Sequence, residues 1–297
     1  MTESVERLLD RAERLLQRLE ALIPEPGVQP NWENATAFRW QGKGNAVPLQ
    51  EILRPRTLRL DDILCLDRQK AALDSNTRQF LHGLPANNAL LWGSRGTGKS
   101  SLIKAMLATY ADRGLRLVEA DRQHLAELPD LLDMLHERQE RFIVYCDDLS
   151  FEADDASYKQ LKAVLEGSLS SPDGNVLIYA TSNRRHLLPE FQSENQETRY
   201  SSGDQGQSEI HFGESVEEKI SLSERFGLWL SFHPFSQDEY LCIVRHWLTQ
   251  LGSPLDRWED IRMLALRFAL ERGSRSGRVA WQFARNWVGR EQLGQLG

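Results

Sequence analysis

The sequence lacks several features that mark membrane and secreted proteins. It holds no uninterrupted apolar run of about 18 residues, the length that a membrane-spanning helix requires. Its first residues do not follow the basic and then apolar order of a secretory signal. The cysteines, Cys65, Cys146 and Cys242, are odd in number and far apart, so their spacing suggests neither a disulfide framework nor a zinc site. We therefore expect a cytoplasmic protein with no membrane partner.

The sequence also lacks an excess of positive charge and any cluster of histidines. Its net charge of -7 argues against a protein that coats nucleic acid or a membrane surface. Nucleic acid is the less favoured partner, because it needs a local basic patch, for which Arg184, Arg185 and the arginines between 267 and 290 are candidates. The seven histidines are scattered along the chain, so no metal enzyme is indicated.

One short stretch has the composition of a phosphate-binding loop. It matches the pattern G-x-x-x-x-G-K-[ST] and consists of Gly93, Ser94, Arg95, Gly96, Thr97, Gly98, Lys99 and Ser100. An apolar run precedes it and a helical pattern follows it, as the strand, loop and helix of the motif require. Lys99 would contact the β- and γ-phosphates of a triphosphate, and Ser100 would bind Mg²⁺. A glycine-rich turn with a solvated lysine is the less favoured interpretation.

Further along the chain, short apolar runs alternate with helical patterns. Strands are expected at 115–119, 142–148, 175–183 and 228–232, and helices at 70–82 and 125–138. This alternation predicts a parallel sheet with helical crossovers. Asp147 ends one of the runs, at the sheet edge where α/β proteins bind ligands, so it is a candidate Mg²⁺ ligand. Asn183 ends another run and either orients a water molecule or belongs to a simple turn.

Composition divides the chain into four parts. Residues 1–30 are expected to form an amphipathic helix and a proline-rich linker, the helix docking on the chain's own body or pairing with a partner helix. Residues 31–60 give no periodic pattern and are expected to be irregular. Residues 61–235 form the predicted nucleotide-binding α/β domain, with a mobile loop at 190–214. Residues 236–297 carry three helical patterns, at 240–251, 258–271 and 277–289.

Taken in order, these segments resemble the AAA+ ATPases from about residue 61 to the end of the chain. The chain looks closest to a bacterial family of AAA+-like ATP-binding proteins catalogued as domain of unknown function 815. The residues that carry this resemblance are 85–101, 146–152, 181–186 and 222–227. It implies a P-loop NTPase fold with three αβα layers, a parallel five-stranded sheet in the order 5-1-4-3-2 and a small helical lid. It also implies ATP and Mg²⁺ as ligands. Ser101 joins the loop residues in the nucleotide-binding site that the resemblance implies.

The resemblance further implies roles for single residues. Asn183 matches the polar residue called sensor one. Arg225 matches the arginine finger that reaches the γ-phosphate bound by a neighbouring subunit, which implies a homo-oligomer with shared active sites. Arg278 best matches the lid arginine called sensor two, with Arg275 as the alternative.

One position departs from the pattern of the AAA+ proteins. They commonly place a glutamate after the Mg²⁺ aspartate to polarise the attacking water, whereas this chain has Asp148, which is one methylene shorter. Either Asp148 or Glu152 would then be the general base. This departure bears on hydrolysis and not on the binding of ATP.

Two functions from different classes follow. The first is a Mg²⁺-dependent ATPase that uses hydrolysis to remodel or load an unknown protein partner. The second is a slow or non-hydrolysing ATP-gated adaptor, in the manner of nucleic-acid-associated loaders. A P-loop kinase of a small molecule explains the loop but not the combination of Asn183, Arg225 and the helical lid.

Overall fold

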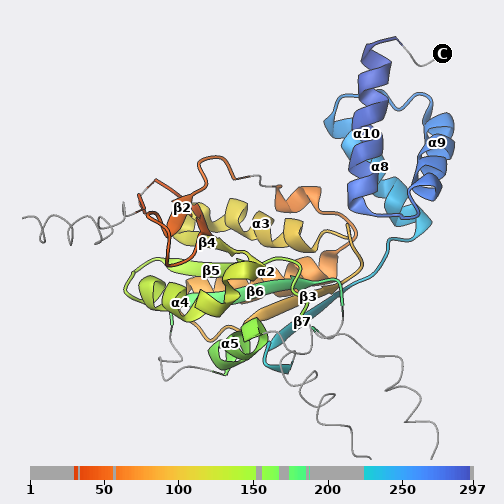
Figure 1. Cartoon of the computed structure of the whole chain (residues 1–297). Helices are drawn as coiled ribbons and strands as arrows, with labels where there is room; N and C mark the ends of the chain where they lie inside the picture. The colour runs from red at the N-terminus through yellow and green to blue at the C-terminus, as the bar shows by residue number, and fades with distance from the viewer. Residues whose placement is uncertain are drawn as a thin grey trace, which may run out of the picture.

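The computed structural model describes residues 30–32, 34–55, 58–151, 156–166, 174–184, 187 and 224–294. The predicted amino-terminal helix and the loop at 190–214 lie outside these residues. Figure 1 shows an α/β body built on one sheet and a group of helices that follows the last strand.

The sheet of the described chain has seven strands, in the order β2-β1-β4-β5-β6-β3-β7. Their bounds are β1 Ala37–Trp40, β2 Leu49–Glu51, β3 Ala89–Gly93, β4 Leu115–Ala120, β5 Arg141–Cys146, β6 Val176–Ser182 and β7 Leu228–Phe232. Every neighbouring pair is parallel except β1 and β2. The predicted parallel α/β fold is therefore confirmed, and β7, β3, β6, β5 and β4 lie in the order 5-1-4-3-2.

Two expectations about the sheet were wrong in detail. The sheet contains seven strands and not five, and the region 31–60, expected to be irregular, supplies the extra two. β1 pairs in parallel with β4 from Ala37 to Trp40, and β2 pairs antiparallel with β1. Strands of four and three residues are too short to show an alternating pattern, and here they form by pairing with an existing edge.

Helices cover both faces of the sheet. On one face, α2 (Asp67–Leu81) and α3 (Lys99–Tyr110) enclose a core that includes Leu73, Met106 and Tyr145. On the other face, α4 (Leu128–His136) and α5 (Ala156–Leu165) enclose a second core around Phe142 and Val144. Figure 1 shows α3 and α4 on opposite sides of the sheet. β5 is buried on both sides, as its continuous apolar run predicts.

Three helices follow β7: α8 (Gln237–Gln250), α9 (Trp258–Glu271) and α10 (Gly277–Gln292). α8 begins at a capping box, in which Glu239 N donates to Ser236 Oγ at 3.2 Å and Ser236 N donates to Glu239 Oε2 at 2.7 Å. The described residues also contain three short 3-10 helices, at Leu60–Asp62, Ala111–Arg113 and Arg122–Glu127. None of the helices in the described residues combines the length and the apolar character that crossing a membrane requires.

Candidate functional site

The loop between β3 and α3 makes a sharp turn that requires glycine. Gly93 has a φ of 131°, and a Cβ placed there would lie 1.9 Å from the Phe232 carbonyl oxygen of β7. Ser94 N also donates to that oxygen, at 3.0 Å. Gly96 and Gly98 have φ values of 76° and 102°. The loop backbone therefore depends on residues without a Cβ, which is the reason for the glycine spacing in the sequence.

Lys99 begins α3 and turns its side chain back into the loop. Its Nζ donates to the carbonyl oxygens of Gly93 at 2.7 Å and Ser94 at 2.8 Å, and to Asn183 Oδ1 at 3.2 Å. Burial lowers the pKa of Lys99, against the opposing effect of the nearby carboxylates Asp148 and Asp147. The Lys99 ammonium is buried, and the oxygens that accept its hydrogen bonds are all neutral. A bound anion would therefore stabilise its charge.

Ser100 and Asp147 meet at the end of β5. Ser100 Oγ donates to Asp147 Oδ1 at 2.8 Å, and Thr181 Oγ1 donates to the same oxygen at 2.6 Å. Burial raises the pKa of Asp147, but the hydrogen bonds to its carboxylate, that from Thr181 first among them, and the positive charge of Lys104 outweigh burial, so the pKa lies below its ordinary value. The Asp147 carboxylate is therefore charged. Its oxygen atoms and the Ser100 hydroxyl are ligands of the kind that a hard cation such as Mg²⁺ prefers.

Asp148 adopts a left-handed backbone conformation, with a φ of 51°. Its N–H donates to Thr181 Oγ1 at 2.9 Å, and its carboxylate accepts a hydrogen bond from Asn183 Nδ2. Arg95 Nη2 lies 3.8 Å from Asp148 Oδ2. Aspartate tolerates the left-handed region better than a longer side chain does, because its short carboxylate can bond locally. This conformation gives a physical reason for Asp148 at a position where the AAA+ pattern has glutamate.

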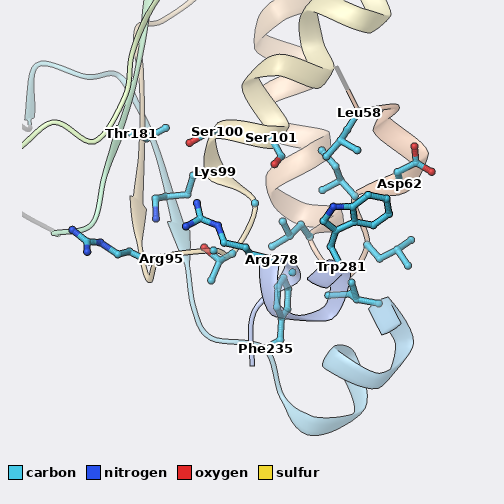
Figure 2. A pocket seen from close by; sticks show the side chains of 18 of the residues that line it. Leu58, Asp62, Arg95, Lys99, Ser100, Ser101, Thr181, Phe235, Arg278 and Trp281 are labelled. Carbon is cyan, nitrogen blue, oxygen red and sulfur yellow. The ribbon is translucent and has the colours of Figure 1, made fainter. Parts of the chain in front are cut away.

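These residues line one cavity of about 560 Å³. Its polar end holds the loop from Arg95 to Ser101 together with Asp147, Asp148, Thr181 and Asn183. Its apolar end is lined by Leu58, Ile63, Leu64, Leu66, Phe235, Ile243, Trp247 and Trp281. Figure 2 shows Lys99 and Ser100 on one side of the cavity and Trp281 on the other. A cavity with a cationic, hydroxyl-lined end and an aromatic end fits a nucleotide in both size and chemistry.

Two of the three carboxy-terminal helices, α8 and α10, line the cavity beside the loop. A Cβ on Gly96 would lie 2.8 Å from Ser276 Oγ, so the start of α10 packs directly on the loop. Arg278 lines the cavity, whereas Arg275, the alternative for the lid arginine, is absent from its lining. Arg278 is also close enough to Lys99 to oppose the charge of that ammonium. The geometry thus brings Arg278 to the predicted site.

Two predicted residues lie elsewhere. Arg225 is not among the residues that line the cavity, and its guanidinium donates to the Glu166 carboxylate after α5. Glu152, the alternative base, lies outside the described residues. Within the described part of the chain, no group of three or more His, Cys, Asp and Glu side chains could hold a metal ion.

Sequence reasoning missed Thr181 and the apolar end of the cavity. Thr181 contacts both aspartates, and the polar run that ends β6 is the signal that could have indicated it. Trp247 and Trp281 come from α8 and α10 and meet with ring centroids 4.6 Å apart. No local pattern joins these two tryptophans to the loop, because only the packing of the helices brings them there.

Comparisons with known proteins agree on a family and a fold. A family model described as "Protein of unknown function (DUF815)" matches residues 33–291. No curated protein matches the chain. A solved structure of a RuvB variant from Thermotoga maritima is 15% identical and covers 82% of this chain and 67% of its own, with a TM-score of 0.54. The replication initiator DnaA bound to AMPPCP and single-stranded DNA is 14% identical and covers 83% and 67%, with a TM-score of 0.52. These similarities show the AAA+ fold.

Proposed function

Because the chain belongs to the DUF815 family and has the fold of the AAA+ ATPases, we propose that it binds ATP with Mg²⁺ and hydrolyses ATP to ADP and phosphate. The observation that carries this proposal is the convergence of Lys99, Ser100 and Asp147 at one end of a cavity of about 560 Å³. These groups come from α3 and from the residue after β5, and they provide a cation for phosphate and oxygen ligands for a metal ion.

The loop residues hold the triphosphate in this proposal. The amides of residues 95–100 face it, and the start of α3 adds the positive end of its dipole. Lys99 exchanges its carbonyl partners for the β- and γ-phosphates, which satisfies its buried charge. Ser100 and Asp147 would hold Mg²⁺, and the ion would supply positive charge to the phosphate oxygens.

Asp148 and Asn183 act on the attacking water. Asp148 is the general base, because it follows β5 beside Asp147 and lines the same cavity. Asn183 contacts both Asp148 and Lys99, so it can position the water relative to the γ-phosphate. Arg278 contacts the phosphates from the lid, and the apolar end of the cavity takes the base and its sugar.

We further propose that the protein works as a homo-oligomer on a protein client. Arg225 lies outside the cavity of its own chain, which suits a residue that serves the site of a neighbouring subunit. It would have to exchange Glu166 for the γ-phosphate, and an arginine there stabilises charge on the transferring group. The client would be remodelled or loaded as the lid moves with the nucleotide state.

A second candidate is an ATP-gated switch that hydrolyses slowly. The observation in its favour is the engagement of Asp148 with Asn183 and Arg95, which occupies the carboxylate that would activate water. A short side chain held in this way gives slow turnover unless a partner rearranges the site. Both candidates bind ATP, and they differ in the rate at which they hydrolyse it.

Calorimetric titration with Mg²⁺-ATP tests the shared part. Lys99→Ala should weaken affinity by at least about a hundredfold, because charge-assisted contacts to two phosphates are lost. Lys43→Ala is the matched control, since Lys43 pairs with Asp130 at 2.6 Å and does not line the cavity. Equal affinity of the two variants, with both folded, would contradict ATP binding at this loop.

A further inference from the structure

Cys65 packs against the start of helix α8, which also carries Cys242, although 177 positions separate the two cysteines. The Cys65 thiol donates to the Glu239 carbonyl oxygen at 3.9 Å. A helix carbonyl points along the axis toward the following turn, and here that turn carries Cys242. Cys242 is near enough to affect the pKa of the Cys65 thiol, and both are free thiols. Their distance in sequence gave no indication of this pair.

The pair joins two walls of the nucleotide cavity. Leu64 and Leu66, on either side of Cys65, line the cavity from the segment before α2, and Ile243, next to Cys242, lines it from α8. A second contact between the same walls is His246 Nε2 to Asp62 Oδ1, at 3.2 Å. Both contacts are non-covalent, so separation of α8 from the segment 60–66 would open the apolar end of the cavity.

We propose that Cys65 and Cys242 form a reversible disulfide that fastens lid helix α8 to the segment 60–66 and retards nucleotide release. The effect on nucleotide rests on the proposed function, whereas formation of the bond does not. Lid opening commonly limits the release of a bound ligand, and a covalent link across the opening removes that motion.

The two cysteines differ in exposure, and this difference decides which thiol reacts first. Cys242 is exposed, whereas Cys65 is half-buried. Burial and the neighbouring Cys242 raise the pKa of the Cys65 thiol to about 12, so Cys65 stays protonated at neutral pH. Cys242 is therefore the sulfur that meets an oxidant first, and Cys65 is the resolving thiol.

Hydrogen peroxide can oxidise the two thiols to a disulfide in two steps. Cys242 sulfur attacks the O–O bond, which breaks as an S–O bond forms, and one water leaves. Cys65 sulfur then attacks Cys242 sulfur, the S–S bond forms, and the hydroxide departs with the Cys65 proton as a second water. Two thiols have lost two electrons to peroxide, and a reducing thiol such as dithiothreitol reverses the bond.

The experiment treats the reduced full chain with hydrogen peroxide and maps unreduced peptides by mass spectrometry. We expect a peptide pair linked through Cys65 and Cys242, while Cys146, fully buried in β5, keeps its thiol. Oxidation of Cys242 to the sulfinic acid without a linked peptide, or a link to Cys146, would overturn the disulfide.

Release of a fluorescent ATP analogue then tests the lid. Oxidised protein should release it about tenfold more slowly than reduced protein, and dithiothreitol should restore the rate. Cys242→Ser, a change at an exposed position, should make release insensitive to peroxide. Unchanged release from fully linked protein would overturn the effect on the lid. Failure of the reduced protein to bind the analogue contradicts the proposed function and is seen before any oxidant is added.

Discussion

Ser100 Oγ lies 2.8 Å from Asp147 Oδ1, so the first turn of α3 and the end of β5 are joined by a hydrogen bond. Thr181, at the end of β6, donates to the same carboxylate oxygen at 2.6 Å. The two side chains proposed to bind Mg²⁺ are thus positioned by the protein itself. Such preorganisation lowers the cost of ordering them when a nucleotide enters.

The lowered pKa of Asp147 predicts a pH-dependent contribution to stability. A carboxyl whose pKa is lowered by folding stabilises the protein above its ordinary value, here 3.8, and this contribution is lost as the pH falls through the folded value. Asp147→Asn should therefore destabilise the protein at neutral pH, and the difference should shrink in acid. Urea unfolding of both proteins at several pH values measures it. A difference in unfolding free energy that stays constant below pH 3.8 would contradict the assignment.

Gly93→Ala should disrupt the fold of the loop. Its Cβ would meet the Phe232 carbonyl oxygen at 1.9 Å, and relief requires movement of β7. We expect a loss of about 3 kcal/mol of unfolding free energy, from overpacking together with the cost of the positive φ. Gly114→Ala is the matched control, since Gly114 also has a positive φ, of 89°, but has open space around it. That change should cost only about 1 kcal/mol. Similar losses in denaturant unfolding would argue against the close approach at Gly93.

Arg225→Ala tests the shared site. If Arg225 serves a neighbouring subunit, the variant should bind ATP normally and lose turnover by a factor on the order of 10³ at concentrations where the protein assembles. Glu166→Gln is the paired variant, because it weakens the partner that holds Arg225 while keeping the arginine. Its turnover should match or exceed that of the unaltered protein. A rate per subunit that is independent of concentration and unchanged in Arg225→Ala would remove the shared site.

The local parts of the fold follow from the sequence, because each is encoded within a few residues. The apolar run 89–92, the glycines and Lys99 lie together in the chain, and strand, loop and helix form in that order. β5 was predicted for the same reason. By contrast, β1 and β2 are short and depend on pairing with β4. Their residues carry no pattern that distinguishes them from a loop.

The contacts within the site depend on strand register, which single segments do not specify. β5 and β6 pair with Cys146 opposite Ala180, which brings the next residues, Asp147 and Thr181, side by side. The sequence indicated that both strand ends were polar, but not which side chains would touch. The sequence does not predict the left-handed backbone of Asp148 either, because this conformation depends on contacts across the sheet edge.

Turnover of Mg²⁺-ATP by Asp148→Asn, measured beside ATP binding, tests the central claim most directly. Asparagine tolerates the left-handed backbone at this position, so the variant should fold and bind ATP with unchanged affinity. The account predicts that the unaltered protein hydrolyses ATP and that Asp148→Asn is slower by at least about a hundredfold, because the general base is lost. Equal turnover by the two proteins, with equal ATP affinity, would contradict the assignment of Asp148 and of the hydrolytic site built around it.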